Sequence, residues 1–476
     1  MKLSIYRFLT IITVTTLLYA CAVGPKFEKP VVQTPASYIN VDSVAVIQDS
    51  TLNLKWWELF NDPTLDSLIK LALEENKDLL IAASRLEQSR YNLGYNRADY
   101  YPKINYGAGV SSGNFAGGFL SFSETQTVYN VNGQLNWEID FWGKFRRQTE
   151  SAKAEMLASQ YGLRTVQIGL ISEVARNYFL LLDYKSRYEI SQRTFDSRDS
   201  GHKIIQARYE RGIIPEIDVN QSQIQLSISR ASIPNYDRLI TNTENNLNML
   251  LGRNPSSISI STNLFEQEIK PNIPTGLPSD LLSRRPDILS SAEQLHAQTA
   301  KIGMAQAMRY PTISLTGLFG AVSDDLAGLT TGNSAWSAGV NLMGPLFHFN
   351  KNKRRVQIER EKTEQAVLLY EKTVITAFSE VENSLKSIET LNEELQARKE
   401  QSDAASNAER LSFERYNMGV TSYLEVLENQ RYSFEAALLF SETYQKLLNA
   451  YISLYKALGG GWISEEEMNT SETESN

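Results

Sequence analysis

Strict alternation of apolar and polar residues marks four segments of the chain, arranged as two pairs. In the segment 126–138, the apolar positions are Thr127, Tyr129, Val131, Leu135 and Trp137, and the polar positions are Asn130, Asn132, Gln134 and Asn136. The apolar positions of the other three segments are Ile104, Tyr106, Ala108 and Val110; Ile313, Leu315, Gly317, Phe319 and Ala321; and Trp336, Ala338, Val340 and Leu342. A period of two predicts strands with one apolar and one polar face. Their length of about 10 residues suits a tilted transmembrane strand, although a half-buried sheet in a soluble domain would show the same alternation.

Two very long helices follow these strand pairs. No proline occurs in residues 144–211 or 351–417. Apolar residues recur there at spacings of three and four, at Leu163, Val166, Leu170, Val174 and Leu181 in the first segment and at Val374, Phe378, Val381, Leu385, Ile388 and Leu395 in the second. Such a seam is typical of coiled-coil packing. At 1.5 Å per residue each helix would be on the order of 100 Å long, which suits a tube or a tether and not a compact enzyme.

The chain repeats itself with a period of about 207 to 209 residues. Tyr101-Pro102 corresponds to Tyr310-Pro311, Arg146-Arg147 to Arg354-Arg355, and the segment 209–212 to 416–419. These matches stay in the same order along the whole chain, so we expect each half to contain a helix, a strand pair, a very long helix, a tight turn and a further helix.

The predicted strands require more than one copy of the chain. Four transmembrane strands leave two unpaired edges, and each unsatisfied backbone group in lipid costs several kcal/mol. Two copies would give about 8 strands and a filled interior, whereas three would give about 12 and an open one. The polar faces rich in Asn and Gln favour the open case, so a trimer is the smallest assembly that leaves a channel.

The first residues predict export and lipid attachment. Lys2 and Arg7 precede an apolar run, Phe8–Leu18, that is shorter than a membrane-spanning helix and reads as a signal peptide over residues 1–20. Cys21 is the single cysteine and follows Ala20, where lipoprotein signal peptidase cuts. A chance cysteine within the apolar segment is the alternative. Stable anchoring takes about two acyl chains, and a lipidated N-terminal cysteine provides them.

Composition and charge narrow the function further. The net charge is −8, which argues against nucleic acid as a partner. The three histidines, His202, His296 and His348, are widely spaced and show no metal-ligand pattern. No nucleophile elbow and no phosphate loop is present. The sequence therefore predicts no catalytic residue, no metal and no cofactor.

Two groups of residues resemble a known family, the outer membrane factors or TolC-like efflux channels. The first group is Trp56-Trp57, Phe60, Asp62-Pro63, Leu65, Leu68, Asn76 and Asp78-Leu79, and the second is Arg284-Arg285-Pro286-Asp287-Ile288, Ala292-Glu293, Ile302-Gly303 and Tyr310-Pro311. Together with Cys21 and Val23-Gly24-Pro25, they resemble the lipoprotein branch of NodT or OprM type. The resemblance covers nearly the whole mature chain.

This resemblance implies an α+β membrane protein in the cell outer membrane that extends into the periplasm. The implied assembly is a homotrimer with a 12-stranded β-barrel, four strands per protomer, continued by a long periplasmic α-helical barrel. A mixed equatorial domain and an internal two-fold repeat complete the fold. The implied partners are outer-membrane lipid, a periplasmic adaptor (membrane fusion) protein and an inner-membrane pump of RND or ABC type.

The predicted organisation has six parts. They are a signal peptide at 1–20, a lipidated N-terminal arm and equatorial segment at 21–63, a first repeat at 64–252 with strands at about 103–138, an equatorial connection at 253–283, a second repeat at 284–459 with strands at about 312–346, and a C-terminal tail at 460–476.

The turns between the long helices and their successors are the predicted working ends. Gly212 and Gly419 would end the helices as C-cap glycines, leaving Ile213, Ile214 and Val420 as apolar residues on exposed tips. We expect Gly212, Ile213, Gly419 and Val420 to contact the adaptor, as the family resemblance implies. Scattered apolar residues on a surface are the plain alternative.

Glu425 and Glu428 follow the second turn, and their i, i+3 spacing places both carboxylates on one helical face. By resemblance they align with the acidic ring of a closed periplasmic aperture, while Asp218 and Tyr416 match positions of a latch. Thr421 stands where some relatives carry a latch arginine. A simple solvated acidic face is the alternative for the two glutamates.

The main hypothesis is thus a passive export duct that conducts substrates from periplasm to exterior. A coiled-coil lipoprotein that tethers membranes would also explain the long helices and Cys21, but it leaves the four amphipathic strands unexplained. A periplasmic enzyme has no candidate site. The sequence does not indicate the transported substrate.

Overall fold

The computed structural model describes residues 22–35, 37–39, 56–113, 126–267, 281–331 and 334–460. The predicted signal peptide, Cys21, part of the connection 253–283 and residues 461–476 lie outside the described residues. The described helices and strands are η1 (Trp56–Phe60), α2 (Pro63–Glu75), α3 (Lys77–Arg97), η2 (Ala98–Tyr100), β1 (Lys103–Gly113), β2 (Gln126–Ile139), α4 (Lys144–Glu210), α5 (Glu216–Leu250), η3 (Leu264–Glu266), α6 (Leu281–Arg284), α7 (Pro286–Ala307), β3 (Thr312–Ser323), α8 (Gly328–Thr331), β4 (Ser334–Met343), α9 (Lys351–Asn417) and α10 (Tyr423–Ala457).

The chain divides into two compact units. The first comprises residues 1–31, 85–160 and 290–371, and it holds the four strands with the adjoining parts of the helices. The second comprises residues 32–84, 161–289 and 372–476, and it holds α5, α10 and the remaining parts of α4 and α9. Each unit therefore draws on both halves of the sequence.

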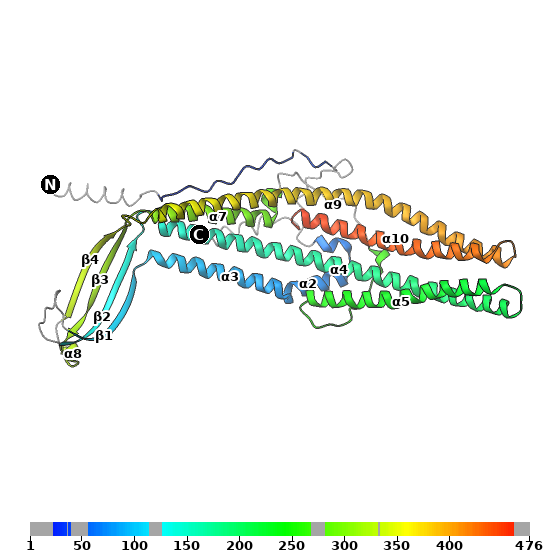
Figure 1. The fold of residues 1–476 in the computed structure, drawn as a ribbon, viewed down its shortest axis with the longest axis horizontal. Coiled ribbons are helices and arrows are strands. Elements are labelled where there is room, and N and C mark those ends of the chain that lie inside the picture. Colours follow the sequence, from blue (N-terminus) through cyan, green and yellow to red (C-terminus); the bar gives the residue numbers. More distant parts are fainter. Residues whose placement is uncertain are drawn as a thin grey trace. The chain divides into compact units, whose positions relative to one another are not determined.

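The first unit is built on one antiparallel sheet of order β1-β2-β3-β4 (Figure 1). Its register aligns Val131 with Ala108 on β1 and with Ala321 on β3, and Phe319 with Trp336 on β4. All the predicted apolar positions consequently lie on one face of the sheet, and the alternation predicted from the sequence is confirmed. On that face Tyr106, Phe319 and Trp336 are largely exposed.

The opposite face of the sheet is polar. Asn132 donates to the Oδ1 of Asn130 over 3.3 Å, and Gln134 donates to the Oδ1 of Asn132 over 3.1 Å, forming a ladder of side-chain amides along β2. On β1, Gly109 and Gly107 align with Asn130 and Asn132 and leave room for their amides. The ladder thus gives each of these three amides a hydrogen-bond partner.

The long helices begin and end close to the predicted residues. Both α4 and α9 contain 67 residues, and both α5 and α10 contain 35. In the second unit, Val174 and Leu181 on α4 and Val374 and Val381 on α9 are fully buried, as the predicted seam requires. Within the described part of the chain, no helix is both long and apolar enough to cross a membrane.

Asp62 forms a buried polar centre in the second unit. Its Oδ1 caps α2 by accepting from the backbone N–H of Thr64, and its Oδ2 accepts hydrogen bonds from Tyr178, Thr262 and Gln267 over 2.6, 2.7 and 2.8 Å. Burial opposes ionisation, but these bonds outweigh it and lower the pKa of the Asp62 carboxyl. One carboxylate thereby joins α2, α4 and the segment after α5.

The N-terminal arm is fixed to the first unit through its backbone. Arg147 donates to the carbonyl oxygens of Val23 and Gly24 over 3.3 and 3.2 Å. Gly24 has a φ of +114°, and a side chain there would meet the Cα of Gly303 at 2.4 Å. Glycine is required at both positions because the two backbones touch.

Candidate functional site at the helix turns

The turn between α4 and α5 is a glycine C-cap. Gly212 has a φ of +72°, its N–H donates to the carbonyl of Tyr209, and the N–H of Ile213 donates to the carbonyl of Arg208 over 3.0 Å. This pattern is the Schellman motif, which satisfies the last carbonyls of a helix. The predicted role of Gly212 in ending the helix is confirmed.

The turn between α9 and α10 repeats this geometry. Gly419 also has a φ of +72°, and the N–H of Val420 donates to the carbonyl of Arg415 over 3.0 Å. A Cβ added at either glycine would meet no other part of the structure within 4 Å. The glycines therefore serve the backbone conformation and not a close contact.

Each turn presents an apolar residue to solvent. Ile213 is 65% exposed and Val420 66%, and Met418 in the second turn is exposed as well. The expectation that Ile214 is also exposed is wrong. Ile214 turns inward and packs with Val219 on a buried cluster, because the chain there already curves into α5.

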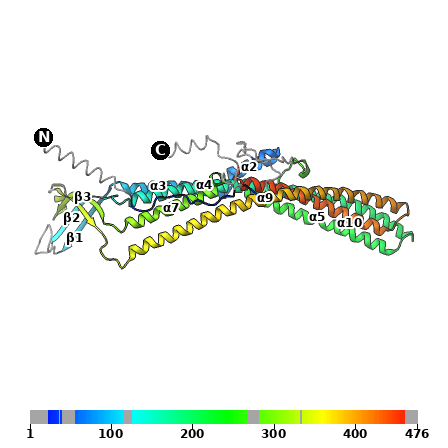
Figure 2. The same cartoon turned by 90° about the horizontal axis from the view of Figure 1, so that it is seen from above.

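That buried cluster joins the four helix ends. Its buried members are Ile205 on α4 and Tyr423, Val426 and Leu427 on α10, and the half-buried residues packed on it are Ile214, Val219, Phe413 and Tyr416. Figures 1 and 2 show the ends of α4, α5, α9 and α10 running side by side. Both turns are thus mounted on one core formed by both halves of the sequence.

Glu425 and Glu428 lie on the face of α10 that this core leaves free. Glu425 accepts a hydrogen bond from the hydroxyl of Thr421 and pairs with Arg415 at 3.3 Å. Glu428 accepts from the Tyr432 hydroxyl over 3.3 Å and lies 3.9 Å from Arg431. These pairs are exposed, so each contributes little to stability and leaves its carboxylate accessible to water.

Tyr416 and Asp218 both lie near Tyr423. The Tyr416 and Tyr423 rings are 5.2 Å apart, and the guanidinium of Arg208 stacks on Tyr416 at 5.0 Å. The Tyr416 hydroxyl is buried and has no hydrogen-bond partner among the described residues. Burial, and then the neighbouring Tyr416 and Asp218, raise the pKa of Tyr423 to about 12. Both predicted latch residues therefore lie near Tyr423 within one chain, and the Tyr416 hydroxyl bonds neither Asp218 nor any other described residue.

Arg198 is a functional candidate that the sequence reasoning missed. This α4 residue is 4% exposed, and it donates to the carbonyl of Gln225 on α5 over 2.8 Å and to that of Gln430 on α10 over 3.1 Å. It precedes the buried Ile205 by seven residues, so it occupies a seam position of the coiled coil. A charged residue at a seam position is the sequence signal by which Arg198 could have been recognised as a buried contact between helices.

The histidines have separate surroundings. The Nδ1 of His202 contacts the Ser222 hydroxyl at 2.7 Å, and His296 lies between Glu293 and Glu150 at 3.2 and 3.3 Å. His348 lies in the connection after β4. In the described ranges, no three residues of types His, Cys, Asp and Glu come together as metal ligands would.

Comparisons with known proteins identify the fold and the class of function. The family model for the outer membrane efflux protein matches residues 68–253 and 277–460. The solvent efflux pump outer membrane protein SrpC of Pseudomonas putida is 33% identical, over 94% of this chain and 96% of its own. The probable outer membrane lipoprotein SilC of Salmonella typhimurium is 28% identical, over 96% of this chain and 99% of its own.

Among solved structures, the CmeC outer membrane channel of Campylobacter jejuni superimposes with a TM-score of 0.88 at 25% identity, covering 95% of this chain and 98% of CmeC. It thus shares both the strands and the long helices described above. This chain belongs to the outer membrane efflux protein family, and it is an outer-membrane efflux channel and not an enzyme.

Proposed function

We propose that three copies of this chain assemble into a channel through which substrates pass from periplasm to exterior. The observation that carries the proposal is the four-stranded sheet. Its described strands pair only as β1-β2, β2-β3 and β3-β4, so β1 and β4 each keep one unpaired edge. In lipid these edges must be paired, and three sheets joined edge to edge give a closed barrel of 12 strands.

The two faces of the sheet support this assembly. The exposed apolar face, with Tyr106, Phe319 and Trp336, suits contact with lipid chains. The face with the amide ladder of Asn130, Asn132 and Gln134 suits a water-filled lumen. The alternative of a coiled-coil lipoprotein that tethers membranes does not explain a sheet with one apolar and one polar face.

Lipid attachment at Cys21 fits the position of the N-terminal arm. The N–H of Val23 donates to the carbonyl of Trp142 over 3.1 Å, and Trp142 follows the end of β2 by three residues. A diacyl anchor two residues before Val23 would lie close to the level at which the strands leave the membrane. The name of SilC as an outer membrane lipoprotein agrees with this assignment.

The two turns are the proposed contact for a periplasmic adaptor. Ile213 and Val420 are exposed apolar residues at equivalent positions of the two halves, so a trimer would present six of them. An adaptor that offers apolar helix ends would cover them. The relative SrpC is a component of an efflux pump, and an inner-membrane pump of RND or ABC type is the proposed source of energy.

Glu425, Glu428, Asp218 and Tyr416 are the proposed gate. Three copies of the acidic α10 face would form two stacked rings of carboxylates, which attract cations. Because a buried hydroxyl normally has a partner, the Tyr416 hydroxyl is available for a hydrogen bond that no described residue of the same chain supplies. In a closed trimer, the carboxylate of Asp218 is the proposed acceptor.

Two matched substitutions test the assembly. Val131→Lys places a charge on the apolar face at the middle of β2. A lysine on the lipid-facing side at the bilayer midplane destabilises a barrel by about 2–4 kcal/mol. Asn132→Lys places the same charge on the polar face one residue further along. We expect unheated gel electrophoresis of outer membranes to show a trimer band for the wild type and Asn132→Lys, and little or none for Val131→Lys. Equal trimer bands for the two variants, or a wild type that migrates as a monomer, would contradict the proposal.

A further inference from the structure

The connections between strand and long helix differ in charge between the two halves. In the first half, Asp140 accepts from the backbone N–H groups of Phe145 and Arg146 over 3.0 and 2.9 Å and pairs with the Arg146 guanidinium at 3.3 Å. The second connection, residues 344–350, contains no acidic residue, and the first turn of α9 has none either. The start of α9 instead carries the basic residues Lys351, Lys353, Arg354 and Arg355.

These basic residues lie at the N-terminus of α9, where positive charge is electrostatically unfavourable. The start of an α-helix carries a partial positive charge, so cations there are unfavourable and an anion is favourable. Within the described part of the chain, neither Lys351 nor Arg355 pairs with an acid. The polar contact of the Arg355 guanidinium is the sulfur of Met308 at 3.1 Å, which is a weak acceptor. Most donors of this half-buried guanidinium are therefore unsatisfied by the protein.

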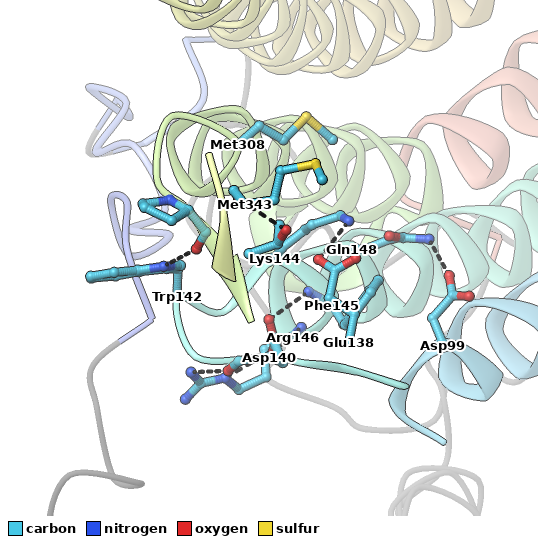
Figure 3. Close-up of polar contacts among 12 residues, drawn as sticks. Asp99, Glu138, Asp140, Trp142, Lys144, Phe145, Arg146, Gln148, Met308 and Met343 are labelled. Carbon is cyan, nitrogen blue, oxygen red and sulfur yellow. Dashed lines mark hydrogen bonds and ion pairs between the residues drawn. The ribbon is translucent and has the colours of Figure 1, made fainter. Parts of the chain in front are cut away.

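A cavity of about 470 Å³ lies at this point, entirely within the first unit. Lys351 and Arg355 line it together with the apolar or polarisable side chains of Trp142, Met308, Tyr310 and Met343. Figure 3 shows Met308 and Met343 here, close to Lys144 and Glu138. Glu138 is already paired with Lys144 at 2.9 Å, as Asp140 is with Arg146, so the charge left without a partner is positive.

Of the strand residues that line the cavity, only Ile139 lies on the apolar face of the sheet. Glu138, Thr312 and Met343 line it, and the register places all three on the face of the amide ladder. A lipid in the surrounding membrane would approach the opposite face. The volume is more than ten times that of one water, at about 30 Å³ each, so it exceeds the need of a small inorganic ion.

We infer that this cavity is a binding station for amphiphilic organic anions, in which Lys351 and Arg355 hold a carboxylate or sulfonate. Met308, Met343 and the stacked rings of Trp142 and Tyr310, 4.5 Å apart, contact the apolar body. Flexible methionines adapt to different shapes, so the station is selective for charge and tolerant of skeleton. The inference rests on the proposed assembly in one respect, namely that the polar face of the sheet lines the lumen.

Calorimetry on the trimer in lipid nanodiscs tests the inference with two probes of the same skeleton. Cholate carries a carboxylate, and its primary amide carries none. We expect cholate to bind the wild type, the amide to bind at least about tenfold more weakly, and Lys351→Gln/Arg355→Gln to lower cholate affinity by a similar factor. The control Lys353→Gln/Arg354→Gln removes the same charge from exposed neighbours outside the cavity and should leave affinity unchanged.

Equal cholate binding by the two double variants, or equal binding of cholate and its amide, would overturn the inference. If inorganic phosphate bound as tightly as cholate, the cavity would be a small-ion site and the inference would also be wrong. The trimer band is recorded for every sample. Loss of that band in the wild type would refute the proposed assembly, whereas an intact trimer without cholate binding would refute only the station.

Discussion

The replacement Arg198→Met probes the contact that ties α4 to α5 and α10 behind the proposed gate. Methionine keeps most of the buried aliphatic stem and removes the guanidinium. The two bonds lost are those to the carbonyls of Gln225 and Gln430. The Phe434 ring, which lies 5.1 Å from the guanidinium, keeps an apolar neighbour.

The magnitude follows from two opposing terms. A hydrogen bond from a charged donor contributes about 1.5–3 kcal/mol, so the two bonds contribute roughly 3–6 kcal/mol before desolvation. Desolvation of a guanidinium costs several kcal/mol. Burial lowers the pKa of Arg198 in spite of the nearby Glu409, so desolvation exceeds that attraction. We therefore expect the free energy of unfolding to fall by only about 1–2 kcal/mol, because most of the bonding gain is offset.

The effect on opening is larger than the effect on folding. If α10 moved away from α4 while Arg198 remained, the buried guanidinium would lose the Gln430 carbonyl and would not regain water. Without Arg198 that penalty disappears. The separation of α10 from α4 is then favoured by about 1.5–3 kcal/mol per protomer, which raises its equilibrium constant about ten- to a hundredfold.

Single-channel recording in planar bilayers measures this effect. We expect Arg198→Met trimers to be open far more often than wild type, and Arg193→Met, which changes an exposed arginine on the same helix, to behave as wild type. An Arg198→Met trimer of normal thermal stability with unchanged opening would refute the reasoning, because the two carbonyl contacts would then not restrain the tip.

Three further predictions concern the gate, the tips and the buried centre of the second unit. Glu425→Gln/Glu428→Gln should remove the preference for cations, measured as a shift in reversal potential, while stability changes by less than about 1 kcal/mol because the ion pairs are exposed; unchanged selectivity would argue against the acidic rings. Ile213→Asp/Val420→Asp should leave the trimer band intact and weaken adaptor capture in pull-down, and undiminished capture would place the contact elsewhere. Asp62→Ala should lower stability by roughly 3 kcal/mol or more at pH 7, because it leaves the donors of Tyr178, Thr262 and Gln267 without their acceptor. Since the folded-state pKa of Asp62 lies below the ordinary 3.8, its contribution is present above that value and is lost as the pH falls through the lower folded pKa. Thermal unfolding of wild type and variant should thus converge in acid, and a difference that is independent of pH would contradict the charge-based account.

Periodic features of the fold could be predicted from the sequence. The period of two assigned the named apolar positions of the four strands to one face because neighbouring side chains must alternate, and the register aligns those positions across the sheet. The glycines that end α4 and α9 could be recognised because the Schellman motif needs a positive φ at one position. These rules are local, so they need no knowledge of the tertiary structure.

Features that depend on distant segments could not be predicted in this way. The family motif pointed to Asp62, but its partners Tyr178 and Gln267 are 116 and 205 residues away. Ile214 looked equivalent to its exposed neighbour Ile213, and only the packing of α5 distinguishes them. The cavity at Arg355 depends on Met308 and Trp142, which no sequence spacing connects to it.

The two halves share a backbone and divide the chemistry between them. With the offset of 207 residues that relates Gly212 to Gly419, Asp218 corresponds to Glu425, Glu428 to Gln221, and Arg198 to Ala405. At these equivalent positions the first half therefore supplies the buried arginine and one acid, whereas the second supplies the paired acids and the carbonyl that accepts from the arginine. Because Arg198 reaches from α4 to α10, the half with the acidic face is restrained by the half without it. The two halves thus form similar helical hairpins that differ at these positions. Through Arg198, the α4–α5 hairpin restrains the α9–α10 hairpin.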